Sequence, residues 1–106
     1  MLKIKQQILP DVSNVAGYDN SYPPKIENIN LMFYTLKSTY WVFGIADWGL
    51  YNHIDYQSSY KYYLGRRIIV EAPPGIKADI LLIMKAIHDD CLILTNDTFW
   101  DHMNIQ

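Results

Sequence analysis

The sequence has a single cysteine, Cys91, so the chain can form neither an internal disulfide nor a zinc site built from cysteines. It has no apolar run near the ~20 residues that a membrane span needs, and residues 1–10 lack the apolar core of a signal peptide. Lys and Arg number 9 against 11 Asp and Glu, which excludes a protein that holds nucleic acid by charge alone. We therefore expect a cytoplasmic protein in a reducing environment, without a membrane partner.

What the sequence does contain is enough for one globular domain. Half of the 106 residues are hydrophobic and 19% are charged, a balance that argues against disorder. A chain of this length buries roughly two-thirds of its unfolded surface, so we expect one domain over residues 1–106. Nine of the 11 acidic residues are Asp, which prefers turns, helix caps and metal sites.

Stretches typical of strands alternate with stretches typical of helices. Apolar and β-branched runs predict strands at residues 4–9, 39–46, 66–70 and 91–94. Apolar residues at helical spacing predict helices at residues 23–36, 54–64 and 78–88, with a further short helix within residues 98–106. Residues 11–22 are expected to form a polar loop, and Gly49 and Asn52 mark a turn. The alternation indicates an α/β three-layer sandwich with a central, mainly parallel sheet of about four strands.

Two segments of the last third are predicted to be covered on both sides. The run at residues 91–94 is continuously apolar, which suits a strand buried on both faces of a parallel sheet. In the helix at residues 78–88, Leu81 and Leu82 widen the apolar stripe until it extends to both sides of the helix.

Polar side chains follow the predicted strands where functional groups of parallel sheets collect, beyond the carboxyl ends. Five aspartates and one asparagine fall at or near this edge: Asp11, Asn14, Asp47, Asp79, Asp97 and Asp101. Carboxylates brought close together repel one another unless a cation or a proton lies between them. Oxygen ligands without His or Cys favour a hard ion, Mg²⁺ or Mn²⁺. Such an ion suits phosphodiester hydrolysis, because it aligns the phosphate, activates a water molecule and stabilises the leaving oxygen.

Four of these carboxylates also have a structural interpretation, which remains open at this point. Asp11 can close a turn before Asn14, and Asp47 can do the same beside Gly49. Asp79 can complement the dipole of a helix N-terminus, and Asp97 can act as an N-cap after a strand.

Four segments resemble motifs of one nuclease family. Residues 11–16 (DVSNVA) resemble D-G-S-N-V-A, and residues 72–79 (APPGIKAD) resemble A-P-x-G-x-x-A-D. Residues 95–101 (TNDTFWD) are similar to S-N-D-x-[FY]-x-D, and residues 47–55 (DWGLYNHID) to D-x-x-L-x-x-x-I-D. The family is the NYN branch of the PIN-domain ribonucleases, the Regnase-like proteins. The order and spacing match over nearly the whole chain, with Val12 in place of the glycine of the first motif.

This resemblance implies a PIN-like fold and a metal-dependent ribonuclease. Carried over, the metal-binding positions would be Asp11, Asp79, Asp97 and Asp101, with Asp47 as a further member from the looser motif. Asn14 would orient a carboxylate or a water molecule. Because the chain ends five residues after Asp101, we expect a minimal or C-terminally truncated domain. A second copy or a partner protein would then complete the exposed sheet edge.

A basic and aromatic cluster is the candidate contact for single-stranded or structured RNA. It comprises Lys61, Arg66 and Arg67 together with neighbouring tyrosines, and bases of unpaired RNA stack well on aromatic rings. The same residues also fit a half-buried helix with solvated basic side chains. The sequence thus predicts a ribonuclease that uses Mg²⁺ or Mn²⁺. The alternatives are an inactive PIN-like module that binds RNA or protein, and the toxin nuclease of a toxin–antitoxin pair.

Overall fold

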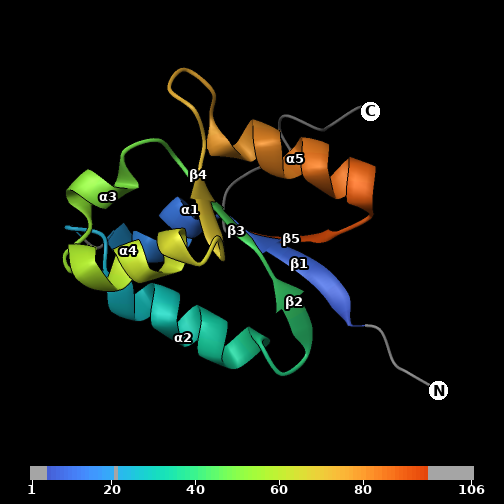
Figure 1. The fold of residues 1–106 in the computed structure, drawn as a ribbon, viewed down its shortest axis with the longest axis horizontal. Helices are drawn as coiled ribbons and strands as arrows, with labels where there is room; N and C mark the ends of the chain where they lie inside the picture. The colour runs from blue at the N-terminus through green and yellow to red at the C-terminus, as the bar shows by residue number, and fades with distance from the viewer. Residues whose placement is uncertain (1–4, 21, 96–106) are drawn as a thin grey trace.

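Short parallel strands form the centre of the structure, a computed structural model that describes residues 5–20 and 22–95 (Figure 1). Strands β2 (Tyr40–Val42), β1 (Gln6–Pro10) and β5 (Leu92–Leu94) form a three-stranded parallel sheet in that order. Strands β3 (Gly44–Ala46) and β4 (Ile69–Glu71) form a parallel pair. The expected mixed α/β architecture with a parallel sheet is confirmed.

The strand predicted at residues 39–46 is divided into β2 and β3, which only Phe43 separates. Its first half pairs with β1, whereas its second half pairs with β4 on the other side. The change of partner occurs between Phe43, whose backbone N–H donates to the Ile8 carbonyl, and Gly44, whose N–H donates to the Ile68 carbonyl. A single bridge between Asp11 and Ile45 continues the contact with the β1 side.

Helices connect the strands, and two of them occupy segments that were expected to be a loop and a turn. Within residues 11–22 lie α1 (Val12–Ala16) and the 3-10 turn η1 (Tyr18–Asn20), and the segment beyond Gly49 contains α3 (Leu50–His53). The loop prediction was wrong because Val12 and Ala16 share one helical face and are both buried. Three of the predicted helices are confirmed with small shifts as α2 (Ile26–Leu36), α4 (Gln57–Gly65) and α5 (Ala78–Asp89). The short helix predicted within residues 98–106 lies outside the described residues.

The helices cover the two faces of the strands unequally, with α1 to α4 on one side and α5 on the other (Figure 1). Successive residues of β3 point to opposite faces. Ala46 therefore packs in the core beneath α1 to α4, while Ile45 packs beneath α5 beside Leu9 and Leu82.

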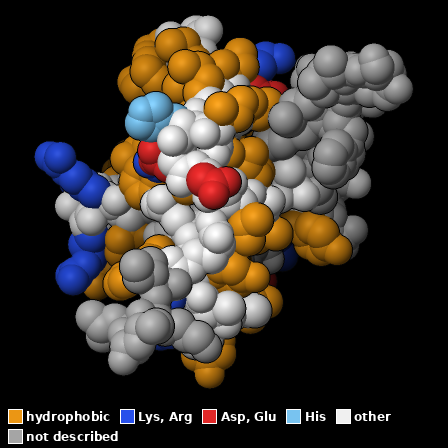
Figure 2. All heavy atoms as spheres, turned by 90° about the vertical axis from the view of Figure 1, so that its right-hand side faces the viewer, with side chains coloured by type: hydrophobic (Ala, Val, Ile, Leu, Met, Phe, Trp, Pro, Cys, Tyr) orange, Lys and Arg blue, Asp and Glu red, His pale blue; other side chains and the backbone are white. Residues whose placement is uncertain are grey.

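The outer side of α5 and the edge strand β5 are less covered than the sequence suggested. Ile80, Met84 and Ile87 of α5 are 49%, 61% and 73% exposed. Leu92 is 47% exposed and the other two residues of β5 are only partly buried, because β5 lies at the border of its three-stranded sheet. The prediction of a strand buried on both faces was therefore wrong. Figure 2 shows the side on which α5 ends, with hydrophobic side chains over much of its upper part. A second copy that covers this edge remains a prediction.

Within the described residues, none of the helices combines the length and the hydropathy required to cross a membrane.

Gly44 is required by the close approach of α1 to β3. A Cβ atom at this position would lie 2.4 Å from Val12 Cγ2, which is buried. We expect Gly44→Ala to lower the free energy of unfolding by about 1–3 kcal/mol through overpacking, measured by urea denaturation. Gly65→Ala is the matched control, because its Cβ would meet nothing within 4 Å. Equal stabilities of the two variants would contradict the close packing.

Candidate active site

A cleft of about 400 Å³ lies at the carboxyl ends of the strands and is lined by Asp11, Asp47, Asp79 and Lys77. Asp11 directly follows β1, Asp47 follows β3, and Asp79 is in the first turn of α5. Three aspartates that are far apart in the sequence thus share one cleft. The sequence placed them at this edge, and the structure brings them together there.

Asp11 is held by the start of α1. Its side chain is only 6% exposed, and its Oδ1 accepts a hydrogen bond from the backbone N–H of Asn14 at 3.2 Å. The Asn14 amide is held in turn, since its Oδ1 accepts from the hydroxyl of Thr95 at 3.4 Å. The structural interpretation of Asp11 is therefore correct, and the same bond presents the carboxylate at the cleft.

Asp47 links α1, β3 and α5. Its backbone N–H donates to Ser13 Oγ at 2.8 Å, and its Oδ1 accepts from the backbone N–H of Ala78 at 2.9 Å. Ala78 is the first residue of α5, so Asp47 caps this helix from outside. One of its oxygens is therefore engaged in the fold, not in a turn beside Gly49 as the sequence suggested.

Asp79 differs from the other two carboxylates. Its Oδ1 is buried, yet within residues 5–20 and 22–95 it has no hydrogen-bond partner. A buried carboxylate oxygen without a partner is costly and is a position where an ion or a water molecule is expected. The start of α5 favours the negative charge but does not satisfy this oxygen.

Lys77 is the member of the cleft that the sequence reasoning did not select. It directly precedes α5 and lines the same cleft, yet in the described part of the chain no ion pair joins it to a carboxylate. The sequence does contain a signal for Lys77. It lies in the loop after β4 and directly before a helix, and such loops line the edge where parallel strands end.

The cleft does not by itself form a complete cage of ligands. In the described ranges, no group of three or more His, Cys, Asp or Glu side chains is close enough to hold a metal ion. Asp97 and Asp101, the other predicted ligands, lie outside the described residues. Mg²⁺ is commonly bound by one or two carboxylates and keeps several waters, so the oxygen-rich donors and the Asp79 oxygen are compatible with such an ion.

Glu71, at the end of β4, has a structural role. Its carboxylate accepts from the backbone N–H groups of Gly49 and Tyr51 at 3.0 Å each, which caps α3. It also accepts from the hydroxyl of the fully buried Tyr60 at 2.9 Å. Burial, together with this bond and the charge of Glu71, raises the pKa of Tyr60, so the hydroxyl stays protonated and remains a donor.

The basic and aromatic cluster lies at the other end of the strands. Arg66 and Arg67 precede β4, and parallel strands begin at the edge opposite the one where they end. The Arg66 guanidinium lies over the ring of Tyr62 at 5.1 Å, and Tyr63 stacks on Phe33 at 4.9 Å. These contacts agree with the half-buried helix, and RNA binding by Lys61, Arg66 and Arg67 remains a prediction.

No protein-family model matches this chain, and no curated protein matches it. The site is therefore interpreted from its own residues.

The different bonding of Asp47 and Asp79 leads to opposite effects on stability. We expect Asp47→Ala to lower the free energy of unfolding by about 1 kcal/mol, because α5 loses its cap. Asp79→Ala should leave it unchanged or raise it by about 1 kcal/mol, because relief of an unpaired buried oxygen outweighs the lost interaction with the helix dipole. Urea denaturation at neutral pH measures both. A larger loss for Asp79→Ala than for Asp47→Ala would show that Asp79 is the structural residue.

Proposed function

We propose that this chain is a PIN-like ribonuclease that hydrolyses RNA phosphodiester bonds with Mg²⁺ or Mn²⁺. The observation that supports it most is the shared cleft of Asp11, Asp47 and Asp79, with one buried Asp79 oxygen that lacks a described partner. Carboxylates gathered at the carboxyl ends of parallel strands are typical of catalytic sites in α/β folds. The resemblance of four segments to motifs of the PIN-domain ribonucleases is the reason for proposing this family.

The strand arrangement is compatible with a PIN-like core. If β2 and β3 are taken as one interrupted strand, the parallel strands follow the order β4, β2 with β3, β1, β5. Taken in this way, the strands would form a four-stranded sheet with helices on both faces, and its switch point would lie beside β1, which Asp11 directly follows. The proposed fold and the aspartate cleft therefore suggest the same place for the catalytic site, the carboxyl end of β1.

Asp11 and Asp79 are the residues that would hold the ion, with Asp47 contributing the part of its carboxylate that does not cap α5. Asp97 and Asp101 complete the proposed set. When bound, the ion would activate a water molecule and stabilise the charge of the transition state. Lys77 would bind the phosphate at the mouth of the cleft, and Asn14, fixed by Thr95, would orient Asp11 through its backbone.

An inactive PIN-like module is the second candidate. It is favoured by the lack of a three-ligand group in the described part of the chain, since a protein that has lost its metal can keep the fold. Calorimetric titration with Mn²⁺ separates the two candidates, because the nuclease has a metal site in the millimolar range or tighter and the inactive module has none.

Asp11→Asn tests the function without removing the helix cap. Asn caps helices as well as Asp, so the fold should persist, with the same or slightly higher stability because charge repulsion in the cleft is relieved. We expect Mn²⁺-dependent cleavage of a mixed single-stranded RNA to fall by roughly 100-fold or more.

Asp55→Asn is the matched control for this variant. Asp55 accepts from the backbone N–H of Ile26 and caps α2 away from the cleft, so cleavage should be unchanged. Wild-type protein that leaves the RNA intact at high concentration, or an Asp11→Asn variant that cleaves normally, would overturn the proposed function.

Lys77 should contribute one phosphate contact. We expect Lys77→Gln to weaken RNA binding and to reduce the slope of log affinity against log salt by about 0.7, the value for one contact to a single strand. Fluorescence anisotropy over a salt series, without divalent metal, measures the slope. Arg66→Gln is the comparison at the other end of the strands. If Arg66→Gln changes the slope of log affinity against log salt and Lys77→Gln does not, the RNA lies over α4 instead of at the cleft.

A further inference from the structure

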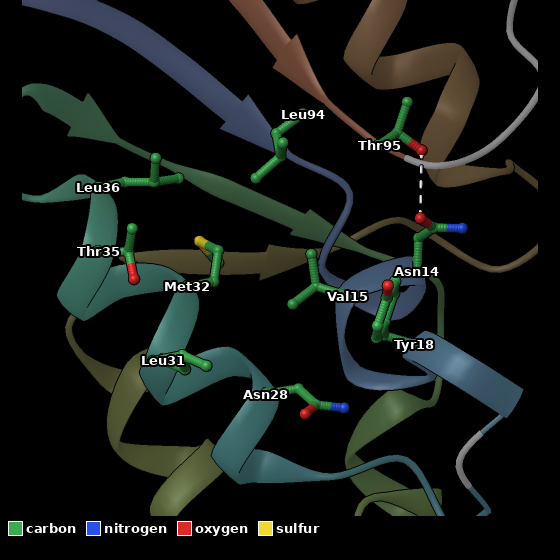
Figure 3. A pocket seen from close by; sticks show the side chains of 10 residues that line it. All are labelled: Asn14, Val15, Tyr18, Asn28, Leu31, Met32, Thr35, Leu36, Leu94 and Thr95. Atoms are coloured by element: carbon green, nitrogen blue, oxygen red, sulfur yellow. Dashed lines mark hydrogen bonds between the residues drawn. The ribbon is translucent and has the colours of Figure 1, made fainter.

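A second, apolar pocket of about 440 Å³ lies between α1 and α2 (Figure 3). Side chains of α2 form one wall, α1 and η1 form the other, and Leu94 and Thr95 lie at the end of β5 (Figure 3). Val15, Met32 and Leu36 supply apolar surface, and none of the ten described residues that line the pocket carries a charge. Its volume is within the range of small-molecule sites.

Asn14 connects the pocket with the cleft. Its side chain lines the pocket, whereas its backbone N–H is bound to Asp11 Oδ1 at 3.2 Å. Thr95, whose hydroxyl donates to Asn14 Oδ1, lines the pocket as well. Asn14 therefore lies between the charged cleft and the uncharged pocket.

A nucleotide has the same two parts, a charged phosphate and a flat, uncharged base. We propose, in an inference that rests on the proposed function, that this pocket binds one unpaired nucleobase of the RNA whose phosphate lies at the cleft. Tyr18 is 62% exposed and lines the pocket, so its ring offers a surface on which a base can stack.

Polar groups on the walls suit a base edge. The Asn28 amide is fixed because its Nδ2 donates to the Ala16 carbonyl at 3.1 Å, and its carbonyl oxygen can accept from a base amino group. Bases in a duplex are paired and stacked inside the helix, so they cannot enter a pocket of this kind. The base that enters the pocket is therefore an unpaired one.

The test is a binding measurement in EDTA, which is independent of cleavage. A fluorescein-labelled oligoadenylate is compared by anisotropy with the same ribose-phosphate backbone without bases. We expect wild-type protein to prefer the oligoadenylate by about 5- to 160-fold, the range for stacking of one base. An oligoadenylate annealed into a duplex should bind no better than the base-free backbone.

Two variants fill the pocket, and one control leaves it open. Thr35 and Leu31 are exposed on α2 and line the pocket, so Thr35→Trp and Leu31→Trp add bulk there without changing the core. Each variant should reduce the ratio of the affinities for the oligoadenylate and the base-free backbone to near one. Tyr34→Trp, on the same helix but outside the pocket lining, should keep it. Thermal unfolding followed by circular dichroism verifies that all three variants fold.

The outcomes separate this inference from the proposed function. A wild-type protein that binds both oligonucleotides equally, or pocket-filled variants that keep the full preference, would overturn the base pocket even if RNA is cleaved with Mn²⁺. If the wild-type protein prefers the oligoadenylate and both Thr35→Trp and Leu31→Trp lose this preference, the result supports base binding in the pocket. If such a protein cleaves no RNA with Mn²⁺, only the proposed nuclease activity fails.

Discussion

Carboxylates that come from other parts of the chain cap the N-termini of three helices. Asp55 binds the first N–H of α2, Glu71 binds two N–H groups at the start of α3, and Asp47 binds the first N–H of α5. The residues at the N-cap positions of these helices form no side-chain cap bond; they are Lys25, Gly49 and Lys77. Because unsatisfied N–H groups at helix ends are costly when buried, these bonds fix where each helix begins relative to the strands.

The candidate site is a consequence of this arrangement. Helix N-termini stabilise negative charge, so acidic residues gather at the edge where strands end and helices begin. Asp47 serves the fold directly and Asp11 caps its own helix, whereas the buried oxygen of Asp79 has no described partner. A buried oxygen without a described partner, beside two carboxylates that each accept a backbone hydrogen bond, is the pattern expected where a site has a task besides stability. The uncharged pocket beyond Asn14 extends the same edge.

Much of the element order could be predicted from local pattern. The helices α2, α4 and α5 follow from apolar spacing, and β1, β4 and β5 from short apolar runs. Helix α1 could not be predicted from periodicity because it has only five residues, and its existence depends on the Asp11 cap and on burial against β3. The division of residues 39–46 into β2 and β3 depends on which neighbours lie alongside each half, and this information is not local.

By itself, the sequence determined that acidic side chains follow the strands, because strand ends and parallel pairing are encoded in short apolar runs. Only the tertiary structure decided their roles, since capping depends on which helix N-terminus comes within hydrogen-bond distance. Asp47 thereby became a cap of α5, the Asp79 oxygen was left without a hydrogen-bond partner among residues 5–20 and 22–95, and Lys77 was brought into the cleft. The pocket beside Asn14 likewise arises where α1, α2 and β5 meet, three segments that no local pattern relates to one another.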